Sequence, residues 1–176
     1  THLHFDHCGG ATRLDREGNI VPTFPKARYL VQRKAWDEAC NPNERALPAY
    51  SHGCSELDVI KERGQLDLLD GDVDLAPGVK ATVAHGHADG HQIVTVNAGS
   101  ERLVFLADLV PTSHHLPLPY ITAYDRYPDQ TLQAKKEVLA RAEREGWLMI
   151  FYHGLVDRAG YIERRGASVP LKAVAV

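Results

Sequence analysis

The segment that most constrains the fold is THLHFDHCGG, which occupies residues 1–10. Strand alternation would place His2 and His4 on the same side of an extended backbone, so that both imidazoles can reach one metal ion. Asp6 and His7 follow at a turn, where the change in backbone direction can aim them at a second metal. The paired glycines let the chain turn tightly beneath such a site. An isolated HxH pair is weak evidence for a metal site, but four ligands at this spacing, followed by GG, predict a metal centre.

One segment cannot fill two coordination spheres, and three further donors stand next to apolar runs. His91 comes just before QIVTVNAG, Asp108 ends LVFLAD, and His153 ends WLMIFYH. A strand holds rigidly the residue at its end, as a binding site requires. Taken singly, each residue has an ordinary explanation as a turn histidine, a turn-capping carboxylate or a hydrogen-bonded histidine. Together, imidazole and carboxylate donors suit zinc, with manganese, iron or cobalt as alternatives.

The remaining sequence predicts a mixed α/β layered domain with helices packed outside the sheets. We find no repeat and no linker that would divide residues 1–176 into separate domains. Helices are expected over 33–39, over 55–64 with Ser55 as N-cap, and over 129–145 with an apolar stripe of Leu132, Val138, Leu139 and Ala142. Strands are expected over 27–32, 65–71, 73–78, 79–86, 92–99, 102–109 and 147–153, with a last edge strand over 160–165.

Composition excludes several classes of protein. The net charge is −3 and the basic residues are dispersed, so we expect no nucleic-acid partner. The longest apolar stretches are far too short to cross a bilayer, so we expect no membrane partner. Three cysteines without a CxxC pair argue against a disulfide framework and favour a reducing compartment, so we expect a cytoplasmic protein.

Four motifs, THLHFDHCGG, HGHADGHQ, FLADLVP and FYHG, together resemble the metallo-β-lactamase superfamily of metal-dependent hydrolases. The resemblance covers the whole chain and implies an αββα sandwich with a dinuclear metal site. It assigns a histidine triplet to the first metal, a mixed triplet to the second and one bridging carboxylate. In that order, these ligands are His2, His4 and His91; Asp6, His7 and His153; and Asp108.

Two departures from the family pattern bear on these expectations. Many members read GHTPGH where this chain has GHADGH, and we match the ligand to the second histidine, which leaves His87 outside the coordination shell. In the superfamily, the HxHxDH motif also follows a first set of strands that is missing here. We therefore expect an N-terminally incomplete domain, poorly stable when expressed alone.

The resemblance implies hydrolysis by a metal-bridging hydroxide, with Asp6 as a catalytic residue that relays a proton to the leaving group. The stretch DLVPTSHHLPLPYITAYDRYP resembles quorum-quenching N-acyl homoserine lactonases and implies a small lactone or ester substrate. Several lactonases carry a tyrosine three residues beyond the bridging aspartate, where this chain has Pro111. The candidate substrate-binding residues are His114, His115, Tyr120 and Tyr124.

Other functions stay open from the sequence. A hydrolase of organophosphate triesters or other esters is the first alternative, and a non-catalytic metal-binding remnant is the second. A redox di-iron protein of the same fold usually replaces some histidine ligands with glutamate, which the seven ligands proposed here do not include. A homodimer is an open alternative to a monomer.

Overall fold

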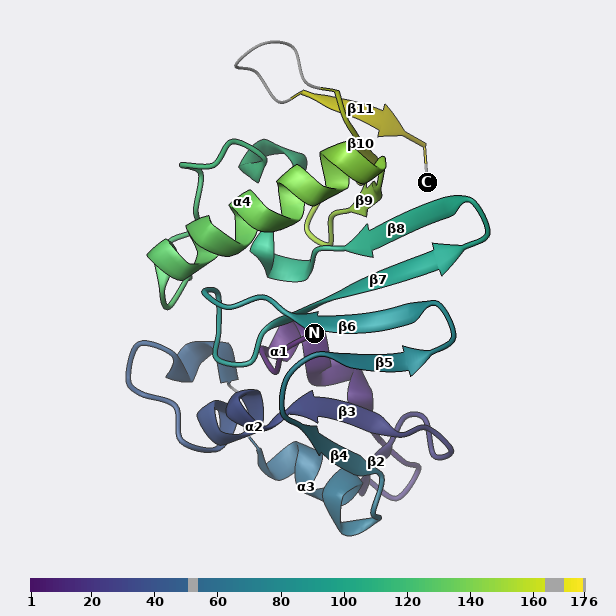
Figure 1. Cartoon of the computed structure of the whole chain (residues 1–176). Helices are drawn as coiled ribbons and strands as arrows, with labels where there is room; N and C mark the ends of the chain where they lie inside the picture. The colour runs from purple at the N-terminus through teal and green to yellow at the C-terminus, as the bar shows by residue number, and fades with distance from the viewer. Residues whose placement is uncertain (51–53, 164–169, 176) are drawn as a thin grey trace. The chain divides into compact units, whose positions relative to one another are not determined.

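The computed structural model describes residues 1–50, 54–163 and 170–175. The chain forms two compact units, Thr1–Gly71 and Asp72–Val176 (Figure 1). Both units combine strands with helices, so the expected mixed α/β class is confirmed. Among the described residues, none of the helices has the length and apolar character needed to cross a membrane.

Unit 1 contains two small sheets among its described residues. The first is an antiparallel hairpin and the second is a parallel pair of strands connected through helices. In chain order, the elements are α1 (Phe5–Cys8), the 3₁₀ helix η1 (Gly9–Ala11), β1 (Thr12–Leu14), β2 (Ile20–Pro22), β3 (Tyr29–Gln32), α2 (Arg33–Cys40), the 3₁₀ helix η2 (Leu47–Tyr50), α3 (Ser55–Glu62) and β4 (Leu66–Leu69).

The parallel pairing of β3 with β4 explains the helices between them, because parallel neighbours need a long crossover connection. Strand β3 runs directly into α2, and α3 leads back to β4. Both helices bury one face in a common hydrophobic cluster, to which Trp36 and Ile60 contribute. Leu3, from the metal-ligand motif, packs into the same cluster. The motif is therefore anchored to the core of this unit.

Two expectations for unit 1 are wrong. Cys40, the last residue of α2, forms a disulfide with Cys54, so the odd cysteine count did not exclude disulfide bonding. Ser55 is the first residue of α3, and Cys54 takes the N-cap position. Gly64 follows the end of this helix with a φ of 67°, the left-handed conformation expected of a helix stop.

Unit 2 is built on a seven-stranded sheet, counted over the described residues, in the order β11-β10-β9-β8-β7-β6-β5. All neighbouring strands are antiparallel except β8 and β9, which are parallel. Its elements are β5 (Val73–Ala76), β6 (Val79–Val83), β7 (Gln92–Ala98), β8 (Glu101–Phe105), the 3₁₀ helices η3 (Ala107–Leu109) and η4 (Ser113–His115), α4 (Pro128–Glu145), β9 (Leu148–Ile150), β10 (Ala159–Ile162) and β11 (Leu171–Val174).

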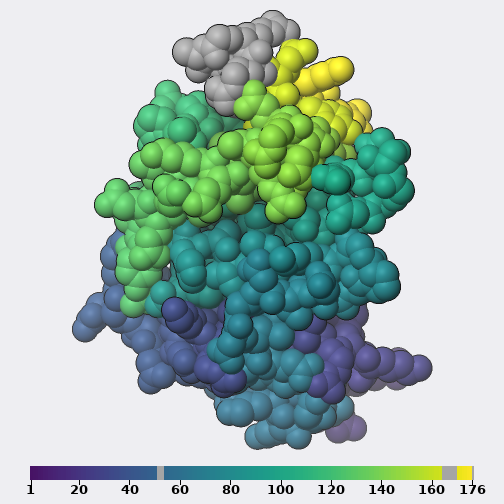
Figure 2. Space-filling model, in the orientation of Figure 1, coloured from purple at the N-terminus to yellow at the C-terminus, as the bar shows by residue number. Residues whose placement is uncertain are grey.

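Helix α4 is the crossover that makes β8 and β9 parallel. Pro128 occupies its first turn and Gly146 ends it with a φ of 66°. Leu139 and Ala142 pack against sheet residues such as Met149, and Figure 1 shows the helix lying over these strands. Its other side lies at the surface, in green in Figure 2.

The expected last edge strand is placed differently in the structure. Strand β10 pairs with β9 on one side and with β11 on the other, so it lies inside the sheet and β11 is the edge. Gly160 fits this interior position, because an added Cβ would lie 2.5 Å from the carbonyl oxygen of Lys172. Residues 164 and 165 of the expected strand lie outside the described residues.

Candidate metal centre

The N-terminal motif brings three histidines of unit 1 close to one another. Leu3 packs into the hydrophobic cluster, and the ring of His4 lies against Tyr50 of the same cluster, with the ring centroids 5.0 Å apart. The ring centroids of His2 and His4 lie 4.5 Å apart, and those of His2 and His7 lie 4.2 Å apart. Three imidazoles of the motif are thus close neighbours.

A single helical turn supplies the other donors of the motif. The backbone amide of His7 donates to the carbonyl oxygen of His4 at 2.9 Å, which closes the turn of α1. Asp6 lies in this turn, and its Oδ2 is 3.4 Å from Nε2 of His7. Carboxylate and imidazole therefore face the same region, and the motif presents four donors from seven consecutive residues.

In unit 2, parallel strand pairing brings Asp108 and His153 together. Phe105 of β8 is in register with Ile150 of β9, and both strands end at these residues. Asp108 and His153 each lie three residues further along, so they emerge at the same edge of the sheet. Nε2 of His153 is 3.2 Å from Oδ1 of Asp108. Both residues lie just beyond their strands rather than at the last strand position expected from the sequence.

The backbone holds the Asp108 side chain in place. Ala107, directly before it, has a φ of 46°, a left-handed conformation that non-glycine residues rarely adopt. Such strain costs roughly 1–3 kcal/mol and persists only where the surroundings enforce it, often at functional sites. The amide of Asp108 also donates to Nε2 of His91 at 3.2 Å. The carboxylate of Asp108 is therefore oriented by its own main chain.

The structure reverses the expected choice between His87 and His91. Both ring nitrogens of the buried His91 engage the backbone: Nδ1 lies 3.1 Å from the carbonyl oxygen of Ala84, and Nε2 accepts from the Asp108 amide. Burial lowers the pKa of His91 to about 3, so the ring is neutral, as these two contacts require. Neither nitrogen is available to a metal ion.

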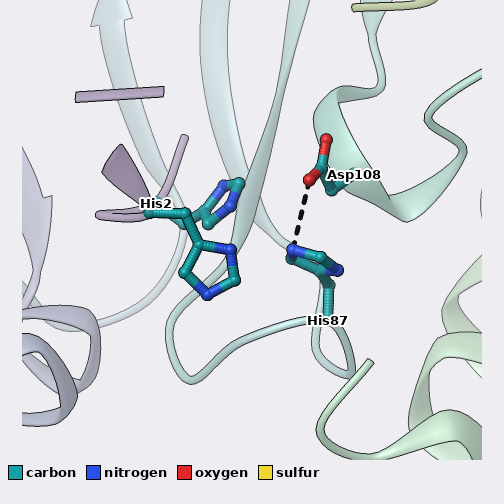
Figure 3. A group of neighbouring side chains, drawn as sticks. His2, His87 and Asp108 are labelled. Atoms are coloured by element: carbon teal, nitrogen blue, oxygen red, sulfur yellow. Dashed lines mark ion pairs between the residues drawn. The ribbon is translucent and has the colours of Figure 1, made fainter. Parts of the chain in front are cut away.

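His87, which the sequence analysis placed outside the ligand set, is the histidine that lies beside Asp108 in the structure. Its Nε2 lies 3.2 Å from Oδ2 of Asp108, and Figure 3 shows the imidazole turned toward that carboxylate. Burial by itself lowers the pKa of His87, but hydrogen bonds to Asp108 and Asp125 outweigh it and raise the pKa to about 9. Asp108 therefore has a different histidine at each of its two oxygens.

Asp125 was not identified from the sequence. It is buried, and its Oδ1 lies 3.0 Å from Nδ1 of His87. Burial raises the pKa of Asp125, but hydrogen bonds from His87 and Thr122 contribute to a net lowering, so the carboxyl group is ionised at neutral pH. The sequence offers little signal for this role, because an aspartate in the loop before a helix usually reads as a turn or cap residue.

The four candidate substrate-binding residues lie in and after η4. His115 Nδ1 is 2.8 Å from Oγ1 of Thr112, whereas the side chains of Tyr120 and Tyr124 are exposed. The main chain of this segment is held by Lys135, whose Nζ donates to the carbonyl oxygens of His115 and Tyr120. Burial, followed by the charge of Lys135, lowers the pKa of His115.

The donors present in each unit are of the types that zinc binds. Imidazole nitrogens and carboxylate oxygens are the common ligands of zinc in hydrolytic sites. The neighbouring thiol does not join them: Cys8 donates to the carbonyl oxygen of Leu3 at 3.4 Å, and burial raises its pKa to about 11. Cys8 therefore stays protonated beside His7 at neutral pH.

Comparison with known proteins identifies relatives of this chain. The chain is 26% identical over 158 residues to the N-acyl homoserine lactonase AiiA of Bacillus thuringiensis subsp. kurstaki, with 88% of this chain and 54% of that protein covered. It superposes with a TM-score of 0.81 and 28% identity on a probable metal-dependent hydrolase from Staphylococcus aureus, covering 100% of this chain and 62% of that one. The chain thus spans a little over half of the length of these relatives.

The fold is shared more widely. The structure of AidC, described as a dizinc quorum-quenching lactonase in complex with a product, matches with a TM-score of 0.81 at 20% identity, over 99% of this chain and 63% of that one. The family description of the metallo-beta-lactamase superfamily matches residues 1–153, which include every histidine and aspartate of both donor sets. The chain belongs to the metallo-beta-lactamase superfamily.

Proposed function

We propose that the protein is a metal-dependent hydrolase that opens lactone rings, with N-acyl homoserine lactones as its substrates. The proposed centre holds two divalent metal ions, zinc in the first instance. Three histidines would hold one ion, a carboxylate and two histidines would hold the other, and one further carboxylate would serve both. These residues are His2, His4 and His87; Asp6, His7 and His153; and Asp108.

The observation that supports this proposal most directly is the environment of Asp108. Its Oδ2 faces Nε2 of His87 and its Oδ1 faces Nε2 of His153, each at 3.2 Å. A carboxylate that bridges two ions needs one oxygen directed to each, with further ligands beside each oxygen. The two histidines come from different loops and face different oxygens of the carboxylate, so each could contribute to a separate ion.

The donor types indicate what the bound ions would contribute. When bound, such ions lower the pKa of water and polarise the oxygen of a substrate carbonyl or phosphoryl group. His87 and His153 would offer their Nε2 lone pairs to such ions after loss of a proton, and each of these nitrogens already faces one oxygen of Asp108. The names of the lactonase relatives support the lactone class for this chain.

Asp6 is proposed to move the proton that the leaving group needs. Opening a lactone adds water across the carbonyl carbon, breaks the ring C–O bond and yields a carboxylic acid and an alcohol. The ring oxygen leaves as an alkoxide and requires one proton. The Asp6 side chain is partly exposed beside His7, so it can exchange protons with solvent while it borders the reacting groups.

Metal analysis tests the centre independently of any substrate. We expect two zinc ions for each chain of the reconstituted protein, and a loss of at least one ion in Asp108→Ala. Asp74→Ala is the matched control, because this carboxylate is exposed on β5 and should leave the content at two. A single tightly held ion that Asp108→Ala does not affect would contradict the dinuclear proposal.

A substrate panel tests the reaction. We expect kcat/KM of the metal-loaded protein to be higher for N-acyl homoserine lactones than for aryl phosphotriesters or β-lactams. Triesters that outrun every lactone by tenfold, about 1.4 kcal/mol of transition-state preference, would replace the lactonase with a phosphotriesterase. Full metal content without turnover of any ester would instead identify a non-catalytic metal-binding protein.

A further inference from the structure

Two loops of unit 2 are joined directly behind the proposed metal ligand His87. The amide of Arg126 donates to the carbonyl oxygen of His87 at 3.1 Å, and the amide of Tyr127 donates to that of Gly86 at 2.8 Å. The loop between β6 and β7 is thereby bound along its main chain to the segment that enters α4. A displacement of one segment must therefore move the other.

The contact is too close for any side chain at position 86. Gly86 has a φ of 129°, and an added Cβ would lie 2.1 Å from Oγ1 and 2.3 Å from the amide nitrogen of Thr131. Only glycine permits both the conformation and the approach. The first turn of α4 therefore rests on the main chain directly before His87, and this places helix residues within reach of its ring.

The buried Asp125 lies within this contact. Its Oδ1 is 3.0 Å from Nδ1 of His87, and Thr122 donates its hydroxyl to the same oxygen at 2.5 Å. Thr131, on the first turn of α4, donates its hydroxyl to the carbonyl oxygen of Tyr127 at 3.5 Å and contributes to the lowered pKa of Asp125. The Asp125 carboxylate is thus held by the Thr122 hydroxyl while it faces the imidazole.

The two nitrogens of His87 consequently face two different carboxylates. When the ring gives up one proton, donation of the Nδ1 hydrogen to Asp125 leaves the lone pair of Nε2 on the side of Asp108. The neutral ring has only one N–H, so the bond at Nδ1 decides which nitrogen can bind a metal ion. Carboxylates that accept from the second nitrogen of a ligating histidine orient the ring and raise its basicity.

We propose that Asp125 is a positioning residue for the metal centre, which holds His87 in the Nδ1–H tautomer with Nε2 directed to the metal side. This inference rests on the proposed function, since it assumes that His87 is a ligand. It assigns the segment from Thr122 to Thr131 a part in metal affinity, although none of its side chains is itself a proposed ligand.

The alternative explanation, that Asp125 only caps α4, does not fit the contacts. The N-cap position belongs to Tyr127, and no side chain makes a capping hydrogen bond there. The neighbouring cation, Arg126, forms its ion pair with Asp89 at 3.3 Å. The contacts of the Asp125 carboxylate instead include the imidazole of His87 and the hydroxyl of Thr122, an arrangement suited to orienting the ring.

Zinc affinity tests the proposal. We measure the dissociation constants of the metal-stripped protein by competition with a chromophoric chelator. Removing the carboxylate in Asp125→Ala should weaken one of the two sites by about 10–100-fold. Asp125→Asn, which keeps an oxygen acceptor without the charge, should weaken it less. Asp89→Asn is the matched control from the same pair of loops and should bind both ions as the wild type does.

A second measurement separates positioning from a general loss of structure. In ¹⁵N NMR spectra of the metal-free protein recorded above the His87 pKa of about 9, where the ring is neutral, His87 should show the Nδ1–H tautomer, and Asp125→Ala should shift it toward a tautomer mixture while the signals of His91 stay unchanged. If Asp125→Ala does not fold, the affinity and tautomer of Asp125→Asn decide the question. Unchanged zinc affinity and an unchanged His87 tautomer in the folded variant overturn the proposal.

His87→Ala separates this inference from the function on which it rests. Loss of one ion in His87→Ala, together with wild-type affinity in Asp125→Ala, would leave the metal centre intact and remove Asp125 from it. Retention of both ions in His87→Ala would remove His87 from the ligand set and overturn the inference with it. The expected result is loss of one ion in the first variant and weakened binding in the second.

Discussion

Replacing Lys135 with methionine should lower the free energy of unfolding more than any surface substitution on the same helix. The Lys135 side chain is fully buried under the segment that follows η4. Its ammonium group donates to four main-chain carbonyl oxygens of this segment, at 2.7–3.4 Å. The acceptors are His115, Pro117, Leu118 and Tyr120. Methionine matches the length of the lysine stem but donates no hydrogen bond.

The magnitude follows from the shortest contacts. The carbonyl oxygens of His115 and Tyr120 lie 2.7 and 2.8 Å from Nζ, and each buried acceptor left without a donor costs roughly 1–3 kcal/mol. Water can reach part of this segment, because Pro117 and Leu118 are exposed. Removing a buried charge offsets some of the loss. We therefore expect Lys135→Met to lower the free energy of unfolding by about 2–4 kcal/mol at pH 7.

The difference should depend on pH in a defined direction. Burial lowers the pKa of Lys135 from 10.5 to about 8, against the opposing charge of Asp125. Between these values the unfolded chain binds more protons than the folded one, so this group makes the free energy of unfolding rise with pH. The contribution amounts to about 1.3 kcal/mol between pH 7 and pH 9, and Lys135→Met lacks it. The gap between wild type and variant should therefore widen at alkaline pH.

Urea unfolding followed by tryptophan fluorescence provides the measurement, since Trp147 lies in the core of the same unit. Lys136→Met is the matched control: it removes the same charge and adds the same side chain one residue further, at an exposed position. The reasoning is refuted if the two variants unfold within about 0.5 kcal/mol of each other, the range of an ordinary surface change. It is also refuted if their difference is constant from pH 7 to pH 9.

Two further predictions concern the covalent link and the loop contact. Replacing Cys40 and Cys54 with serine should cost about 3 kcal/mol of unfolding free energy, as expected for a loop closed over a separation of 14 residues, and a thiol titration of the unfolded wild type should find only Cys8. Gly86→Ala should lower the melting temperature by several degrees through its clash with Thr131, whereas Gly99→Ala, also at positive φ but in open space, should lower it less.

The sequence predicted those parts of the site that follow from local pattern. Apolar runs that end near Asp108 and His153 pointed to both residues once the N-terminal motif was considered with them, and the parallel strands β8 and β9, which end in register, bring the two together. Their proximity follows from the backbone alone. Two neighbouring strands point the same way, and each carries a donor three residues beyond its end.

The choice between His87 and His91 could not be made in this way. The two residues are four positions apart in a loop whose direction is set by Gly86 and Gly90, both with positive φ. No periodicity describes such a loop, and a family pattern with two histidines matches either of them. The decision depends on which imidazole finds main-chain partners, and His91 finds them at Ala84 and at the amide of Asp108.

The buried face of helix α4 also differs from the face that the sequence predicted. The sequence predicted an apolar stripe that includes Leu132 and Val138, whereas the buried positions are Thr131, Lys135, Leu139 and Ala142. These four buried residues follow the spacing of one helical face. The first two of them, Thr131 and Lys135, are polar, so an apolar pattern could not reveal this half of the face. Binary patterning treats a polar residue on a buried face as an error unless it has a function.

Here each polar member supports a loop of the candidate site. Thr131 lies against Gly86, directly before His87 in the chain, and donates its hydroxyl to the carbonyl oxygen of Tyr127, whereas Lys135 holds the carbonyl oxygens between η4 and Tyr120. The apolar end of the same face packs into the sheet core. Apolar residues at 131 and 135 would improve the hydrophobic stripe but would leave both loops without these donors. The first half of the helix is therefore better explained by the site than by the core, and the second half by the core alone.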